Sequence, residues 1–173
     1  MKKQFLAVFA CSLLLMAGNV AFGQEATARL YAKNQKIWNV NTLSASIGDE
    51  SSAVSVRALR HFNNVFDDTT GSKWYVIRDG FMVKLTRNNV SVRMGYNKQG
   101  GWENTIRTYA EDKLPFEIRD MVKKAYYDCS IEIVEEIEVS RGLFYIVHLR
   151  DSRSWKNVLV HDGELELIKE IIK

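Results

Sequence analysis

The same order of elements occurs twice in this chain: an amphipathic helix is followed by four short strands in which apolar and polar residues alternate. The first copy runs from about Ser52 to Tyr109, and the second runs from Pro115 to Lys173. Two such units can bury their apolar faces in a shared core. The pattern therefore predicts an α+β fold, a tandem repeat of a helix plus a four-stranded antiparallel sheet, with the helices packed on one face.

Residues 1–23 have the layout of a secretory signal peptide. Lys2 and Lys3 precede the apolar stretch Phe5–Met16, and small residues suited to cleavage stand before Gln24. Cleavage near Gly23 lowers the formal net charge from +3 to +1, which argues against a nucleic-acid partner. We expect a periplasmic or secreted protein that has no transmembrane segment after signal removal.

The cysteines predict no internal disulfide, because Cys129 is the one cysteine left after signal removal. The simplest role for Cys129 is that of a small buried hydrophobic residue. An alternative for Cys11 is lipidation at the start of the mature chain. Phe9 and the apolar residues that follow Cys11 oppose this alternative.

Residues 24–50 hold few apolar side chains and show no sustained period, so we expect an extended lead-in. The repeat domain then occupies residues 51–173, with halves at about 52–113 and 114–173. Helices are predicted at about 52–66 and 115–126. Strands are predicted at Trp74–Arg78, Phe81–Arg87, Val90–Tyr96, Trp102–Tyr109, Ile131–Val139, Leu143–Arg150, Trp155–His161 and Glu164–Lys169.

Short turns predict how neighbouring strands pair. A two-residue turn at Asn88-Asn89 places Leu85 opposite Val92 and leaves one apolar face along this hairpin. A five-residue loop from Asn97 to Gly101 extends that register to the next strand. Three residues are then expected on the core side: Trp102, Asn104 and Ile106.

Charge is distributed unevenly along the chain. Gly71–Lys113 holds eight Lys or Arg and four Asp or Glu, whereas Asp128–Lys173 holds six and ten. The predicted register places Lys84 opposite Arg93, and like charges in that position cost stability. Arg107 is expected on the same face. The hypothesis is that these three cations form a docking surface for an anionic partner; the alternative is an ordinary solvated sheet face.

The second half places apolar side chains on the face that points away from the predicted core. These residues are Phe144, Ile146, Leu159 and Ile168. A face with so much apolar surface is not expected to be fully wet. Either the lead-in around Trp38 covers it, or it forms an interface with a protein partner, and both explanations remain open.

No residue pattern in the chain predicts catalysis, a metal site or a cofactor. The three histidines, His61, His148 and His161, lack the close spacing of zinc ligands. No Gly-x-Ser-x-Gly elbow or reactive cysteine motif is present. We therefore predict that the protein is not an enzyme.

The region from about Ser52 to Lys173 resembles a family of exported proteins of Bacteroidetes-type bacteria with a β-lactamase-inhibitor-like, PepSY-like fold. The segments that carry this resemblance are Lys73-Trp74-Tyr75, Val92–Gly100, Thr105–Tyr109, Leu114-Pro115, Ala125–Asp128 and Tyr145-Ile146-Val147. They fall mostly at core, turn and cap positions, so they are specific for a fold and say little about activity. The resemblance implies a tandem repeat and, as a broad theme, binding or inhibition of another protein.

These observations favour a non-catalytic periplasmic binding module that presents a sheet face to a protein or peptide. The residues expected to contact the partner are Lys84, Arg93, Arg107, Phe144, Ile146 and Leu159. Two alternatives belong to other classes. One is a structural envelope protein that associates with itself through its basic and acidic halves; the other, with less support, is a hydrolase.

Overall fold

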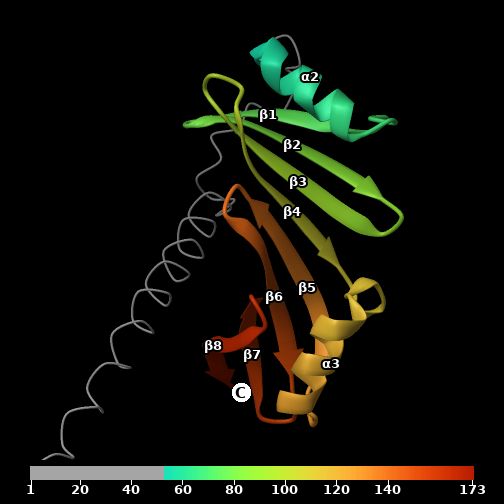
Figure 1. The fold of residues 1–173 in the computed structure, drawn as a ribbon, viewed down its shortest axis with the longest axis vertical. Helices are drawn as coiled ribbons and strands as arrows, with labels where there is room; N and C mark the ends of the chain where they lie inside the picture. Colours follow the sequence, from blue (N-terminus) through green and yellow to red (C-terminus); the bar gives the residue numbers. More distant parts are fainter. Residues whose placement is uncertain (1–52) are drawn as a thin grey trace, which may run out of the picture. The chain divides into compact units, whose positions relative to one another are not determined.

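A computed structural model describes residues 53–173 of the chain (Figure 1). The predicted signal peptide and lead-in lie outside the described residues. Helix α2 spans Val56–Val65, a 3-10 turn η3 spans Glu111–Lys113, and helix α3 spans Phe116–Ala125. The strands are β1 Lys73–Ile77, β2 Gly80–Arg87, β3 Val90–Asn97, β4 Trp102–Tyr109, β5 Ser130–Val139, β6 Gly142–Arg150, β7 Ser154–His161 and β8 Glu164–Ile172.

In the described residues the strands form one antiparallel sheet of eight strands in the order β1 to β8, so each strand pairs with the next one along the chain. The predicted α+β class is confirmed. Strands β4 and β5 also pair, from Asn104 opposite Val139 to Tyr109 opposite Val134. The sheet is therefore continuous between the two predicted halves, and the description of the fold as a tandem repeat stays a prediction.

Both helices pack on the same face of this sheet, as predicted. Residues directly opposite each other in neighbouring strands point to the same side, and one such row crosses the sheet from β2 to β8. Its members are Leu85, Val92, Arg107, Glu136, Tyr145, Val160 and Leu165. The side of the sheet that carries this row is called the helix face. Phe62 of α2 packs on it over β1–β3, and Val122 of α3 packs on it over β5–β7.

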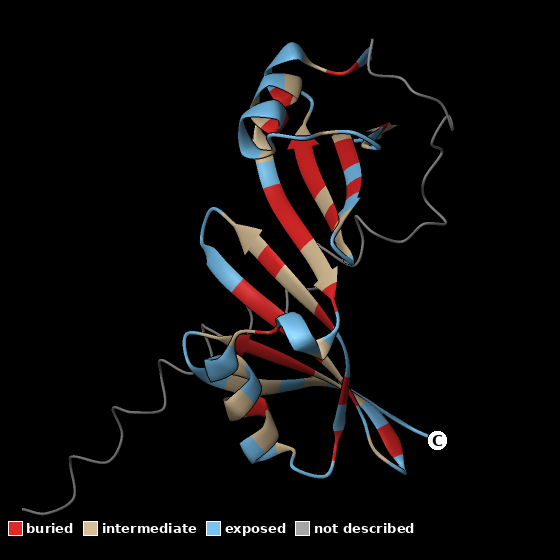
Figure 2. Cartoon of the chain, turned by 90° about the vertical axis from the view of Figure 1, so that its right-hand side faces the viewer, coloured by how far each residue is buried: buried red, intermediate tan, exposed pale blue. Residues whose placement is uncertain are grey.

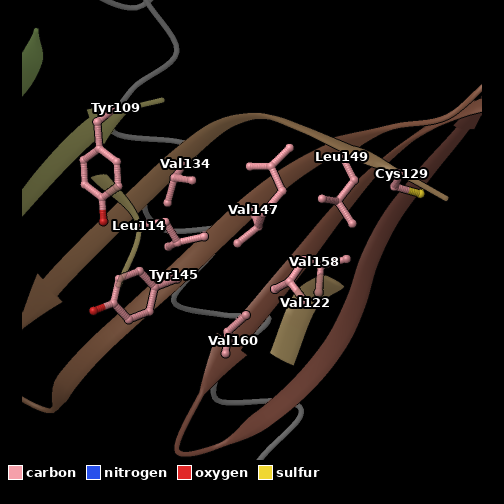
Figure 3. Packing of buried hydrophobic residues seen from close by; sticks show 11 residues of the cluster. Tyr109, Leu114, Val122, Cys129, Val134, Tyr145, Val147, Leu149, Val158 and Val160 are labelled. Atoms are coloured by element: carbon pink, nitrogen blue, oxygen red, sulfur yellow. The ribbon is translucent and has the colours of Figure 1, made fainter. Parts of the chain in front are cut away.

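Each helix covers its own group of buried side chains. Under α2, Phe62 contacts Trp74 edge to face, with the ring centroids 5.5 Å apart. Under α3, Val122 meets valines from β5, β6 and β7, and Cys129 lies at one end of the group (Figure 3). The outer sides of both helices are exposed (Figure 2). The predicted buried role of Cys129 is confirmed.

The backbone conformation of the tight turns explains why the strand register agrees with the prediction in most hairpins. Asn88 and Asn89 both have positive φ angles, 49° and 63°, as a two-residue hairpin turn with the twist of its strands requires. Asp162 and Gly163 repeat this geometry. The first hairpin differs from the prediction, because Ile77 pairs with Gly80 and the turn consists of Arg78 and Asp79.

A β-bulge in β4 overturns one prediction. Tyr96 pairs with Trp102, but Gly95 pairs with Asn104, so Glu103 is an extra residue in the ladder. A shift of one residue moves every later side chain to the opposite face. Trp102 lies on the helix face as expected. Asn104 and Ile106 lie on the other face, and Arg107 lies on the helix face instead of beside Lys84 and Arg93, all against the prediction.

Candidate functional site on the helix-free face

Within residues 53–173 neither α2 nor α3 packs on the second face of the sheet, which we call the helix-free face. One row of residues crosses this face from β1 to β6. Three cations come first, followed by three apolar side chains. In order, the row is Lys73, Lys84, Arg93, Ile106, Ile137 and Phe144. The predicted pairing of Lys84 with Arg93 is confirmed, and Lys73 extends the basic group to β1.

The three cations, named the cation row, differ in their surroundings. Lys73 and Lys84 are exposed, whereas Arg93 is partly buried. Burial lowers the pKa of the Arg93 guanidinium, and the Glu135 carboxylate opposes that effect. Like charges directly opposite each other destabilise a sheet, so the row gains most from negative charge placed over it.

Apolar residues of the helix-free face form an apolar strip beside the cation row. Its members are Met82, Ile106, Ile137, Phe144, Ile146 and Leu159, and each is at most 6% exposed. None of them belongs to the residue groups that pack beneath α2 and α3 in residues 53–173. Phe144, Ile146 and Leu159, expected from the sequence to point away from the helices, do lie on this face.

Polar side chains flank the apolar strip. His148 Nδ1 lies 3.0 Å from Asn157 Oδ1, and His148 Nε2 lies 3.7 Å from Glu135 Oε1. The second distance exceeds that of a hydrogen bond, so we treat this contact as electrostatic. His148, followed by Arg93, lowers the pKa of Glu135, although burial opposes this change. Within residues 53–173 no hydroxyl or thiol hydrogen-bonds to His148, so this group does not contain an activated nucleophile.

Asn104 is the most buried polar side chain of the helix-free face. It is 4% exposed, and its Oδ1 atom has no hydrogen-bond partner among residues 53–173. Gly95 lies directly opposite, where a Cβ atom would meet the Asn104 amide at 3.0 Å. A buried amide oxygen without a partner costs free energy, so this atom is a place where a donor on another group would be stabilising.

Arg107 lies on the helix face, where it forms hydrogen bonds with two glutamates of β5. Its Nη1 atom donates to Glu136 at 2.9 Å and to Glu138 at 3.0 Å. The Tyr109 hydroxyl donates to Glu136 at 2.7 Å. Burial raises the pKa of Tyr109, and the Glu136 carboxylate raises it further. Arg107 thus joins β4 to β5 and does not belong to the cation row.

A second polar network lies at the β6–β7 turn. Asp151 accepts hydrogen bonds from the backbone N–H groups of Arg153 and Ser154, both at 2.6 Å, and also contacts the Lys156 ammonium. The Asp151 carboxylate raises the pKa of Lys156. Lys156 is therefore held as a cation and cannot act as a base toward the neighbouring Ser154 hydroxyl. Burial raises the pKa of the nearby Cys129 thiol, which keeps it unreactive.

The other two histidines contact aromatic side chains. His61 Nδ1 forms a hydrogen bond with the Tyr96 hydroxyl at 3.1 Å, and His161 stacks on Phe144 with ring centroids 3.9 Å apart.

In the described part of the chain no three His, Cys, Asp or Glu residues are grouped so that they could hold a metal ion. None of the helices between residues 53 and 173 has the length and apolar character needed to cross a membrane.

Several residues of this face were not predicted from the sequence. Lys73 was missed because the predicted turn at Asp79-Gly80 would have paired Tyr75 with Lys84. The observed turn, one residue earlier, pairs Lys73 with Lys84. Asn104 was missed because the bulge reverses its face. By contrast, a two-residue turn at Ser152-Arg153 predicts that His148 lies opposite Asn157, and this prediction is confirmed.

Solved structures from Bacteroides share this fold. A BLIP-like protein of Bacteroides fragilis is 12% identical, with a TM-score of 0.56, and the match covers 69% of this chain and 86% of that protein. A DUF2874 family protein of Bacteroides ovatus is 13% identical, with a TM-score of 0.56 and coverage of 69% and 87%. A protein of Bacteroides eggerthii, described as a candidate periplasmic protein, is 10% identical, with a TM-score of 0.55 and coverage of 69% and 88%.

At these identities the likeness shows the fold alone. No family model matches the sequence, and no curated protein matches it. The β-lactamase-inhibitor-like part of the resemblance is confirmed at the level of the fold, whereas its PepSY-like part stays a prediction. The chain has the α+β fold of BLIP-like proteins.

Proposed function

We propose that this protein is a non-catalytic binding module of the cell envelope that docks a protein or peptide on its helix-free face. The observation that carries the proposal is the single row in which Lys73, Lys84 and Arg93 lead into apolar side chains. An apolar centre with charged groups at its edge is the usual composition of a protein interface. The partner segment is expected to carry acidic residues next to apolar ones.

The fold shared with a BLIP-like protein and with a candidate periplasmic protein supports this proposal. A periplasmic location also agrees with the predicted signal peptide. By analogy with the BLIP-like neighbour, the proposal extends to inhibition of the bound protein. The tandem repeat remains part of the proposal, because the second helix and its four strands follow the same order as the first.

In-cell photo-crosslinking tests the proposed function. A photo-crosslinking residue replaces Lys73, and the same residue replaces Glu117 on α3 as a control on the opposite face. One defined envelope protein is expected to be captured from position 73 and not from position 117. The variant Arg93→Glu should reduce that capture severalfold by reversing the charge beneath the partner. Equal capture from both positions, or capture unaffected by Arg93→Glu, would overturn the proposal.

Self-association is a second candidate, favoured by the exposed edge of the sheet. Among the strands of residues 53–173, β8 is the last in the sheet, and its Leu167, Ile171 and Ile172 are exposed. An unpaired apolar strand edge can pair with another chain. If the basic and acidic halves also meet between copies, dimers should form in dilute buffer and dissociate as the salt concentration rises. A monomer on a sizing column in dilute buffer would reject this candidate.

A further inference from the structure

Strand β8 forms one edge of the sheet in residues 53–173, and this edge is long and partly apolar (Figure 1). It is nine residues long, whereas β1 at the other edge has five. The outer N–H and C=O groups of an edge strand can pair with a further strand, and short edges limit this. Leu167, Ile171 and Ile172 of β8 are 44%, 50% and 71% exposed. Strand β8 is therefore the edge better suited to pairing.

We propose that two copies of this protein associate through β8, which pairs antiparallel with β8 of the second copy about a twofold axis at Leu167. The pairing is a specific form of self-association, the second candidate function, and it depends on that function. Antiparallel pairing joins the two sheets into one and keeps both helix-free faces on the same side. The cation rows of the two copies therefore stay accessible to a partner.

A β-bulge in β8 decides which residues can lie opposite each other in such a pair. Leu167 and Lys169 pair with consecutive residues of β7, so Ile168 is an extra residue in the ladder. Residues directly opposite each other point to the same face of a sheet. Glu166 and Lys169 both lie on the helix-free face, on the two sides of the bulge. With the axis at Leu167, Glu166 of each copy therefore lies opposite Lys169 of the other.

Charge favours this register over the other twofold arrangements. Each other axis on a ladder residue from 165 to 171 places like charges directly opposite each other, which destabilises a sheet. For axes at residues 165, 166, 169, 170 and 171 in turn, these pairs are Glu164 with Glu166, Glu166 with itself, Lys169 with itself, Glu170 with itself, and Lys169 with Lys173. Only the axis at Leu167 avoids such pairs, and it forms two pairs of opposite charge instead.

The side chains of β8 are able to make these contacts. Within residues 53–173 the side chains of Glu166 and Lys169 form no ion pair or hydrogen bond. Glu170 faces an apolar residue of the second copy, but its carboxylate already lies 3.2 Å from Lys156 Nζ and needs no new cation. Leu167, 44% exposed in one copy, meets Leu167 of the other at the axis. Pairing therefore buries apolar surface without leaving a charge unpaired.

Disulfide trapping in the purified mature protein tests the register. Leu167→Cys places two thiols opposite each other across the axis, where Cβ atoms about 4.5–5.5 Å apart allow a disulfide. Mild oxidation should link most of this variant into dimers. Glu164→Cys is the matched control: its two copies would lie about 20 Å apart, so its yield should be at least tenfold lower. Equal yields from both positions, or no dimer from Leu167→Cys, would overturn the pairing.

Charge reversal provides a second, independent measurement. Glu166→Lys and Lys169→Glu should each raise the dimer dissociation constant about tenfold in sedimentation at low salt, because each creates two like-charged pairs. Mixing the two variants should restore association, since every reversed charge then lies opposite its complement. Glu117→Lys on α3 is the control and should leave the dissociation constant unchanged. A mixture that stays monomeric, or single variants that associate as the unmodified protein does, would contradict the pairing.

The pairing and the proposed functions fail in different ways. A protein that stays monomeric, while an envelope protein is still captured from position 73, would reject the pairing and leave the docking function standing. A dimer trapped by Leu167→Cys, with no protein captured in cells, would do the reverse. Oligomers that salt dissociates and Leu167→Cys does not trap would reject the pairing but keep self-association through the basic and acidic halves.

Discussion

Arg107 holds two carboxylates together at the centre of the helix face. Glu136 and Glu138 lie on the same face of β5, and the Arg107 guanidinium contacts both. Its side chain is 30% exposed, so the surrounding water screens these contacts only in part. The arginine therefore compensates like charges that would otherwise repel each other beside the Tyr109 hydroxyl.

Arg107→Met should lower the free energy of unfolding by about 1–3 kcal/mol, because it leaves both carboxylates without their cation while keeping a similar volume. Urea unfolding at neutral pH measures this loss. Lys84→Met is the matched control. Lys84 is exposed and lies opposite another cation, so its replacement should change stability by less than about 0.5 kcal/mol. Equal effects of the two variants would contradict the role given to Arg107.

Asp151 ties the β6–β7 turn together as a carboxylate. Hydrogen bonds from Lys156 and from the backbone of Arg153 hold its pKa well below the value of 3.8 that the free side chain has. A carboxyl whose pKa is lower in the folded state stabilises the fold at any pH above 3.8. That contribution is lost as the pH falls from 3.8 through the folded-state value, because the carboxylate becomes protonated.

Asp151→Asn should therefore lower the melting temperature at pH 6, and the difference from the unmodified protein should shrink as the pH falls below 3.8. Thermal unfolding followed at a series of pH values measures this difference. Asp79→Asn, in the exposed β1–β2 turn, serves as the control and should have little effect at pH 6. A melting difference for Asp151→Asn that stays constant down to pH 2 would show that the charge of Asp151 does not matter.

At the scale of elements, the first hairpin depends on the absence of a side chain at Gly80. Gly80 has a φ angle of +152°, and a Cβ atom there would overlap the backbone carbonyl oxygen of Tyr96 on β3. Gly80→Ala should therefore cost about 2–4 kcal/mol of stability, from backbone strain and from forced separation of β2 and β3.

Gly71 provides a matched comparison for Gly80. It also has a positive φ angle, +78°, but a Cβ atom there would have open space around it. Gly71→Ala should cost only about 1 kcal/mol, the price of the backbone conformation alone. Chemical denaturation of the two variants side by side measures the difference. If both cost the same, the close approach to Tyr96 is not what limits residue 80.

Strand register is the feature that the sequence predicts only in part. Local turns such as Asn88-Asn89 fix a hairpin register, so the opposition of Leu85 and Val92 follows from counting residues. The bulge at Glu103 leaves no comparable mark in the sequence. One unmarked residue was enough to place Arg107 on the wrong face. The cation row was found only in part: Lys84 and Arg93 were placed correctly, whereas Lys73 was missed because the first turn lies one residue earlier than predicted.

Pairing between β4 and β5 could not be derived in this way either. No short turn joins these strands, since η3 and α3 stand between them. Their register depends on contacts that form only in the folded sheet, such as Arg107 with Glu136. The sequence predicts neighbours joined by tight turns well, and it predicts neighbours joined by long connections poorly.

For the whole molecule, this continuous sheet predicts that both ends unfold together. Strands β4 and β5 pair along their length, and Val90 packs against the buried groups under both α2 and α3. Loss of one group of packed side chains should therefore weaken the other through the shared ladder. The protein should show a single unfolding transition although each helix covers a group of its own.

Phe62→Ala tests this coupling. Phe62 is 1% exposed under α2, so truncating it should cost about 3–5 kcal/mol. Hydrogen exchange with mass spectrometry across a urea series reports β2–β3 and β6–β7 separately in one sample. In a single cooperative unit the variant shifts the midpoint of both pairs of strands by the same amount. Val122→Ala under α3 is the reciprocal variant and should do likewise, whereas a shift confined to the strands beneath the altered helix would show that the ends unfold independently.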